Sequence, residues 1–123
     1  DGQAHIDGGV HSPTNADVLL QAEALDLIIV SSPMSRQGRR PRLAVDQAMR
    51  GWSGALLDAE VRSLRRQGVR VVGFQPDAAV LTEMGLNPMD PQRRSAIAGQ
   101  AFESALHKLA RADVAARLRL LGA

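Results

Sequence analysis

Two short, nearly continuous apolar runs, separated by a long helical pattern, constrain the fold more than any other feature. The first run is LDLIIV at residues 25–30, and the second is VRVVGF at residues 69–74. Such runs are typical of strands that are buried on both faces of a parallel sheet. Between them, residues 43–66 predict one long amphipathic helix. A strand, a helix and a strand in this order make a parallel β-α-β unit.

The predicted long helix carries an apolar stripe that we expect to face the core. Its members recur at helical spacing: Val45, Met49, Trp52 and Leu56, followed by Leu57, Val61 and Leu64. Asp46 with Arg50 and Asp58 with Arg62 are oppositely charged pairs four residues apart, and we assign them to the solvent side.

Weaker signals predict the other elements. A short strand at 3–6 ends at the glycines of residues 8 and 9, and a short helix follows at 16–24. We expect Asp77 to cap a short helix that reaches Met84. Asp90-Pro91 predicts the start of a longer helix, with Asp90 as N-cap and Pro91 in the first turn. This helix has Ile97, Ala101, Phe102, Ala105 and Leu109 on one face, and a last helix near Asp113 is expected to bury Val114, Leu118 and Leu121.

The predicted order is β-α-β-α-β-α-α-α, which indicates an α/β fold with a mainly parallel sheet. Asp1-Gly2 is typical of a hairpin turn, yet only one arm of such a hairpin would lie in this sequence. We therefore interpret residues 1–123 as one segment, the C-terminal part of a larger α/β domain.

Composition excludes several classes of function. Fifteen basic and thirteen acidic residues give a net charge of +2, and only three residues are aromatic, so we expect no nucleic-acid partner. The absence of cysteine excludes disulfides and thiolate metal sites. No apolar run approaches the ~20 residues that span a bilayer.

Ligands of open α/β sheets bind beyond the carboxyl ends of the strands. Three places qualify in the predicted fold: Asp7, Ser31-Ser32, and residues 75–77. Asp7 has the most distinctive surroundings, because Gly8 and Gly9 let the backbone turn tightly and let another group approach the carboxylate. The alternative is a turn aspartate that only satisfies its own backbone.

The block IDGGV at residues 6–10, followed by SPTNAD at 12–17, resembles the Asp-Gly-Gly block of bacterial patatin-like phospholipases. The apolar strand after it and the NPMDP stretch at 87–91 fit the same family. The resemblance implies the C-terminal part of a three-layer α/β/α patatin-like domain. It also implies a serine acyl hydrolase with a Ser-Asp dyad, in which Asp7 is the base of the motif formed by Asp7, Gly8 and Gly9.

The family's nucleophile lies in a Gly-x-Ser-x-Gly elbow that precedes this block, and a glycine-rich loop supplies its oxyanion hole. The chain contains neither; its nearest approximation, Gly51-Trp52-Ser53-Gly54, falls within the predicted long helix. We interpret Ser53 as a helix residue and these glycines as places of close backbone packing or a helix break. The expected partners are therefore an N-terminal segment of the same protein that carries the serine, and a lipid or ester substrate. The chain alone is expected to be inactive.

Two further clusters have alternative interpretations. His5 and His11 near Asp7 could suggest a metal site, but no third ligand has a useful spacing, so we expect surface histidines and neither a metal nor a cofactor. Arg36, Arg39, Arg40 and Arg42 form a basic loop that is either solvated or in peripheral contact with anionic lipid headgroups. Location is expected to be cytoplasmic or membrane-peripheral. The alternative function for the whole chain is a non-catalytic ligand-binding or interaction module.

Overall fold

The computed structural model describes residues 2–21, 25–36 and 45–119. The elements follow the order η1 (Gly8–Val10), η2 (Ala16–Gln21), β1 (Leu27–Ser31), α1 (Val45–Arg66), β2 (Arg70–Phe74), α2 (Ala78–Met84), α3 (Arg94–Leu109) and α4 (Ala112–Leu118). The two short elements labelled η are 3-10 helices. The chain is thus a mixed α/β structure in which helices predominate.

The two apolar runs form the predicted parallel pair. Ile29 lies opposite Val72 in the register, and Ser31 lies opposite Phe74 at the carboxyl ends. The expected burial of both faces of β1 is wrong, however. Ile28 and Val30 are buried, whereas Ile29, which points to the other face, is 55% exposed. In β2, by contrast, Val71 and Val72 are both buried, so both faces of this strand are covered.

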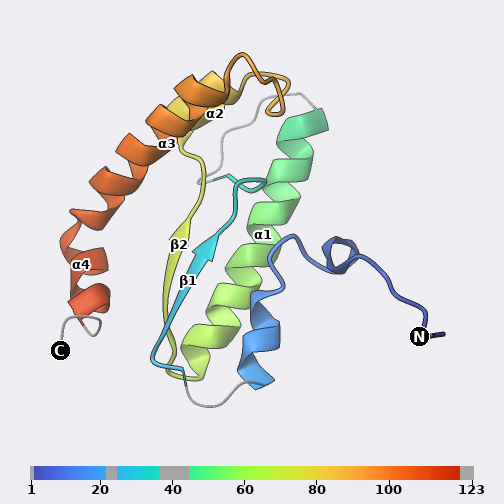
Figure 1. The fold of residues 1–123 in the computed structure, drawn as a ribbon. Coiled ribbons are helices and arrows are strands. Elements are labelled where there is room, and N and C mark those ends of the chain that lie inside the picture. Colours follow the sequence, from blue (N-terminus) through green and yellow to red (C-terminus); the bar gives the residue numbers. More distant parts are fainter. Residues whose placement is uncertain (1, 22–24, 37–44, 120–123) are drawn as a thin grey trace.

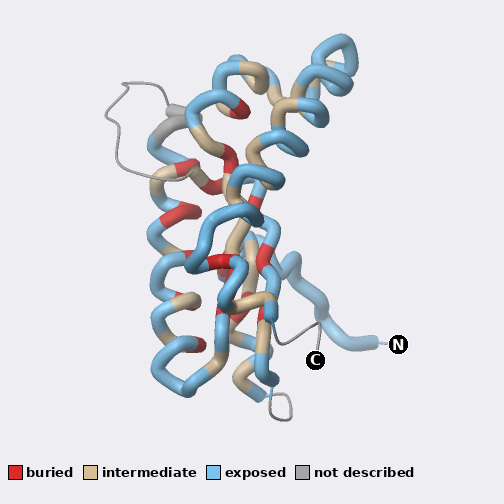
Figure 2. Tube along the Cα trace, turned by 90° about the vertical axis from the view of Figure 1, so that its left-hand side faces the viewer, coloured by how far each residue is buried: buried red, intermediate tan, exposed pale blue. Residues whose placement is uncertain are grey.

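Helices lie on both sides of this small sheet (Figure 1). α1 and η2 are on one side, and α3 and α4 are on the other. The hydrophobic core forms between α1, η2 and the sheet, and includes Ala16, Ile28, Val30, Leu57, Leu64 and Val71. Figure 2 shows the buried positions gathered on the inner sides of these elements, while much of α3 is exposed.

The prediction of one long helix is confirmed, since α1 extends from Val45 to Arg66; residues 43 and 44 lie outside the described residues. Its predicted buried stripe is wrong in the first half, because Met49 and Trp52 are exposed. The buried face has members three or four positions apart, and three of the five are polar: Arg50, Ser53, Leu57, Glu60 and Leu64. The assignment of Arg50 to the solvent side is therefore wrong: the residue is buried, and its guanidinium is satisfied in part by a hydrogen bond from Nη1 to the Pro33 carbonyl, at 3.0 Å.

The predicted strand at residues 3–6 is wrong. Residues 2–7 have no regular secondary structure and are exposed, and the sheet of the described residues contains only β1 and β2. A four-residue extended segment needs a neighbouring strand to supply its ladder hydrogen bonds. Asp7 therefore follows an irregular segment rather than the end of a strand. The predicted helix at 16–24 is the shorter 3-10 helix η2, with residues 22–24 outside the described residues.

The C-terminal helices form where the sequence predicts them, except that one of them begins later than predicted. Asp77 caps α2 as predicted, because its side chain accepts hydrogen bonds from the backbone N–H groups of Ala79 and Val80, each at 3.0 Å. The helix predicted to start at Asp90 begins at Arg94 instead; the Asp90 carboxylate accepts from the Gln92 N–H within the preceding turn.

The side chains of α3 and α4 are buried to different extents. α3 has no buried residue, and Phe102 on its predicted apolar face is exposed. α4 buries Val114 as predicted and leaves Leu118 half-buried, while Leu121 lies outside the described residues.

Candidate functional site

Asp7 is an exposed carboxylate at the start of the 3-10 helix η1. Its Oδ1 accepts a hydrogen bond from the Gly9 N–H at 2.8 Å, which makes Asp7 the N-cap of η1. This is the turn contact that the alternative interpretation describes. Among the described residues, the second carboxylate oxygen has no hydrogen-bond partner. The side chain is thus held by one oxygen and open to solvent at the other.

Both glycines after Asp7 lie close to polar side chains. A Cβ at position 9 would be 3.2 Å from the Asp7 Oδ1, and a Cβ at position 8 would be 3.3 Å from the Asn15 Nδ2. Contacts this short would require the neighbouring side chains to shift. The pair of glycines therefore allows the Asp7 carboxylate and the Asn15 amide to approach the backbone from two sides.

Residues 12–15 close the loop by local hydrogen bonds. The buried Ser12 hydroxyl accepts from the N–H groups of Thr14 and Asn15, at 3.3 and 3.4 Å. Asn15 has a left-handed backbone with φ +46°, a conformation that asparagine tolerates better than most residues. Its Nδ2 donates to the carbonyls of Gly8, at 3.0 Å, and of Ser12. The side chain of Asn15 thereby ties the SPTNAD block to the Asp-Gly-Gly block.

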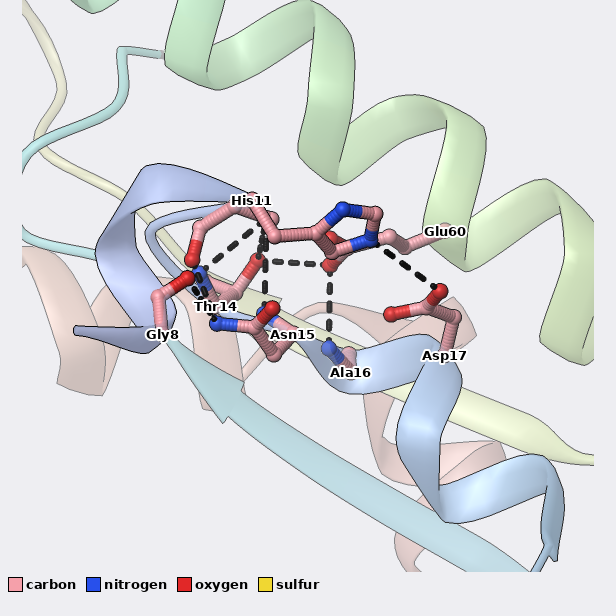
Figure 3. Close-up of polar contacts among 8 residues, drawn as sticks. Gly8, His11, Thr14, Asn15, Ala16, Asp17 and Glu60 are labelled. Atoms are coloured by element: carbon pink, nitrogen blue, oxygen red, sulfur yellow. Dashed lines mark hydrogen bonds and ion pairs between the residues drawn. The ribbon is translucent and has the colours of Figure 1, made fainter. Parts of the chain in front are cut away.

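Glu60, on the buried face of α1, joins this loop to the rest of the fold (Figure 3). Its Oε2 accepts a hydrogen bond from the Thr14 hydroxyl at 2.6 Å and another from the Ala16 N–H at 3.1 Å. Sequence reasoning missed this residue because it expected only apolar side chains on the buried face of the helix. The available signal was its spacing from Leu57 and Leu64, which places Glu60 on the same helix face.

No described serine serves as a partner for Asp7. Ser53 lies within α1 as interpreted, and it is buried. A Cβ at Gly54 would lie 3.2 Å from the Arg36 carbonyl oxygen, so this glycine permits a close backbone approach. Within the described residues, no hydrogen bond joins the Asp7 carboxylate to a serine hydroxyl. A nucleophile that uses Asp7 has to come from outside them.

The histidines near Asp7 are exposed. The His11 Nε2 lies 3.7 Å from the Asp17 Oδ2, an ion pair when the imidazole is protonated. Among the residues that the structure describes, no three or more His, Cys, Asp or Glu side chains are grouped so as to hold a metal ion. Of the basic loop, only Arg36 is described, and Arg39, Arg40 and Arg42 lie outside the described residues.

The two other places proposed from sequence meet at a cavity of about 680 Å³. Ser31 at the end of β1 and residues 75–77 after β2 line it, together with side chains of α2 and α3. Its volume falls within the range of small-molecule sites. The lining is largely apolar and includes Phe74 and Val80, whereas Asp7 does not contribute to it. The carboxyl end of the sheet and the Asp7 loop are therefore two separate places.

Two charged groups of this cavity have altered acidity. A hydrogen bond from the Ser104 hydroxyl, at 2.6 Å, and those of the α2 cap hold the pKa of Asp77 below its usual value. Burial, with the nearby Arg111 guanidinium, lowers the pKa of Lys108. The Lys108 ammonium lies 5.7 Å from the centroid of the Phe74 ring, a cation–π distance. The cavity thus combines an apolar wall with two cationic side chains, Lys108 and Arg111, and the carboxylate of Asp77.

Comparisons of the chain with protein-family models, with curated proteins and with solved structures found no match. Across the described residues, none of the helices is both long enough and apolar enough to cross a membrane.

Proposed function

We propose that Asp7 is the general base of a Ser-Asp dyad in a serine acyl hydrolase of the patatin-like phospholipase type. The observation that carries the proposal is the Asp7 carboxylate itself: it is exposed, and one oxygen is fixed by the Gly9 N–H at 2.8 Å. A general base needs a defined orientation and an open oxygen within reach of the proton that it removes. The sequence blocks IDGGV and SPTNAD support the family.

In this proposal, residues 1–123 are the C-terminal part of a three-layer α/β/α patatin-like domain. The nucleophilic serine, in a Gly-x-Ser-x-Gly elbow, and the oxyanion hole belong to an N-terminal segment of the same protein. The substrate is a lipid or another carboxylic ester. If the substrate is met at a membrane surface, the arginine-rich segment at residues 36–42 is the proposed contact with anionic headgroups.

The chemistry assigned to Asp7 has two proton transfers in each half-reaction. Its carboxylate takes the serine proton as the serine oxygen attacks the ester carbonyl, and the protonated carboxyl then gives this proton to the leaving alcohol. Hydrolysis of the acyl-enzyme repeats these two proton transfers, with water as the nucleophile and the serine oxygen as the leaving group. One carboxylate oxygen is sufficient for these transfers, so the capping bond to Gly9 can persist throughout.

Fluorophosphonate labelling of the complete protein tests the proposal. Replacement of Asp7 by Asn removes the base, and we expect the labelling rate to fall by about 10²-fold or more. Asp26→Asn is the matched control, because Asp26 is an exposed aspartate at the amino-terminal end of β1. Unchanged labelling of Asp7→Asn would exclude Asp7 as the base.

A second candidate, a non-catalytic ligand-binding module, is favoured by the cavity at the carboxyl ends of β1 and β2. Its apolar wall and the half-buried Lys108 fit an amphiphilic anion. Titration with decanoate, followed by NMR, would detect such binding. Binding that is lost in Lys108→Met and kept in Asp7→Asn would support this candidate, and no binding to the wild type would refute it.

A further inference from the structure

Glu60 is a buried carboxylate in the middle of α1, on the face that packs against the N-terminal loop. Glu60 is only 8% exposed, so its carboxylate has lost most of its contact with water. Burial of a carboxylate is unfavourable unless protein donors replace the lost water. The Glu60 Oε2 accepts hydrogen bonds from the Thr14 hydroxyl and the Ala16 N–H, and both donors belong to the SPTNAD block.

These two hydrogen bonds join parts of the chain that are far apart in sequence. Glu60 lies 46 residues from Thr14 and 44 residues from Ala16. The distance of 2.6 Å between the Thr14 hydroxyl and the Glu60 carboxylate is typical of a charge-assisted hydrogen bond. Figure 3 shows the Glu60 carboxylate reaching from α1 to the loop, where it meets both donors. Glu60 therefore fixes residues 14–16 relative to α1.

The position of residues 14–16 in turn determines the position of Asp7. Asn15, between the two residues that Glu60 binds, donates from its amide to the Gly8 carbonyl at 3.0 Å. Gly8 follows Asp7 directly, and the Asp7 carbonyl accepts from the Val10 N–H at 3.0 Å. Hydrogen bonds, together with the peptide links between neighbouring residues, thus lead from the helix α1 to the residue that carries the Asp7 carboxylate.

We infer that Glu60 is a positioning residue that holds the Asp7 loop in a fixed position relative to α1. The inference rests on the proposed function, since a precise location of Asp7 matters only if Asp7 acts on a group from elsewhere in the protein. Glu60 itself touches no reacting atom. Its role depends on the reach of its side chain to two donors, and a shift of about 1 Å in a reacting group can lower a rate by about 10²-fold.

The test compares variants of the complete protein by kcat and KM for p-nitrophenyl butyrate, at a temperature at which all of them are folded. Glu60→Ala removes both bonds, Glu60→Asp keeps the charge but lacks the reach, and Glu60→Gln keeps the reach with a neutral acceptor. Thr14→Val removes only the hydroxyl. Asp58→Asn is the control, because Asp58 is an exposed carboxylate on the same helix.

We expect kcat to fall about tenfold or more in Glu60→Ala and Glu60→Asp, with KM within twofold of the wild type. Glu60→Gln should retain most of the activity, Thr14→Val should lose less than Glu60→Ala, and Asp58→Asn should be unchanged. Amide hydrogen exchange at residues 9, 15 and 16 should be at least tenfold faster in Glu60→Ala. A purely structural role would lower the melting temperature and leave the kcat of the folded enzyme unchanged.

The outcomes separate this inference from the dyad proposal. If Asp7→Asn keeps its kcat, the dyad fails, and with it the positioning role. If Asp7→Asn is inactive while Glu60→Ala and Thr14→Val keep a kcat within twofold of the wild type, only the inference about Glu60 fails. An active Glu60→Asp with an inactive Glu60→Gln would show that charge matters rather than reach, and would also overturn it. If Glu60→Ala does not fold, Thr14→Val decides.

Discussion

Asn15 offers a direct test of the loop that carries Asp7, because two separate features of this residue contribute to stability. Its side chain donates to the carbonyls of Gly8 and Ser12, and its backbone has a φ of +46°. Replacement by Ala removes the hydrogen bonds and leaves a Cβ on a left-handed backbone. Replacement by Gly removes the same bonds but adopts this backbone freely. The comparison of the two variants therefore isolates the backbone contribution.

The magnitudes follow from the surroundings of each group. The bond to Gly8, an exposed residue, should contribute roughly 0.5 kcal/mol, and the bond to the buried Ser12 roughly 1–1.5 kcal/mol. Alanine adds roughly 1–2 kcal/mol for its left-handed conformation, while glycine adds about 0.5 kcal/mol through the greater freedom of the unfolded chain. We expect a loss of about 2.5–4 kcal/mol for Asn15→Ala and about 2–2.5 kcal/mol for Asn15→Gly.

Urea denaturation followed by far-UV circular dichroism measures both values, since the fold is largely helical. Asn87 is the matched control: its side chain also makes a local backbone hydrogen bond, here as the acceptor from the Met89 N–H, but its φ is not positive. At that position Ala should be at least as stable as Gly. If Asn15→Ala proves as stable as Asn15→Gly, the left-handed conformation of the SPTNAD loop is refuted.

Three further predictions concern the C-terminal half. Gly85→Ala should destabilise the protein by about 1 kcal/mol or more, because φ is +59° and a Cβ would lie 2.5 Å from the Arg93 Nη1. Gly99→Ala, in an open position within α3, should stabilise it by up to about 1 kcal/mol. Urea denaturation measures the change in unfolding free energy of both glycine variants.

Ser104→Ala should raise the pKa of Asp77 toward its ordinary 3.8. Because the folded pKa is lowered, the stabilisation is present above pH 3.8 and is lost as pH falls through the folded pKa. Melting curves from pH 2 to 7 should therefore show the variant's deficit disappearing in acid, and a constant deficit would contradict this assignment.

The parallel β-α-β unit was predictable because its signals are long and mutually consistent. β1 and β2 are short apolar runs rich in β-branched residues, and the segment between them has helical spacing over about six turns. Neighbouring parallel strands require a long crossover connection of this kind, which is usually a helix. The cap at Asp77 was equally predictable, since an aspartate directly before a helical pattern is a favoured N-cap.

The orientation of α1 was not predictable from polarity alone. The buried face contains Arg50, Ser53 and Glu60, while Trp52 and Met49 are exposed. Periodicity assigns polar residues to solvent because their burial is unfavourable without partners. Here the partners are backbone groups outside the helix, such as the Pro33 carbonyl and the Ala16 N–H. The sequence of the helix does not predict these partners.

The predicted first strand failed for a related reason. The sequence Gln-Ala-His-Ile at residues 3–6 is compatible with a short strand, but a strand exists only beside a partner, and the described sheet holds β1 and β2 alone. The prediction of Asp7 at the carboxyl end of a strand failed with it. The local chemistry of Gly8 and Gly9 was more informative, because the tight turn expected there is observed as the 3-10 helix η1.

The two interpretations of Asp7, as a cap and as a base, are compatible, and this decides which variant is informative. The capping bond uses Oδ1 and the Gly9 N–H, whereas a base would use the oxygen that is open to solvent. Asparagine caps helices about as well as aspartate, because its side-chain oxygen accepts the same bond. Asp7→Asn should therefore unfold at nearly the same urea concentration as the wild type while it loses fluorophosphonate labelling. Asp7→Ala would remove both functions at once, and its loss of labelling could not be assigned to either. A loss of activity in Asp7→Asn at unchanged stability would thus isolate proton transfer from loop structure.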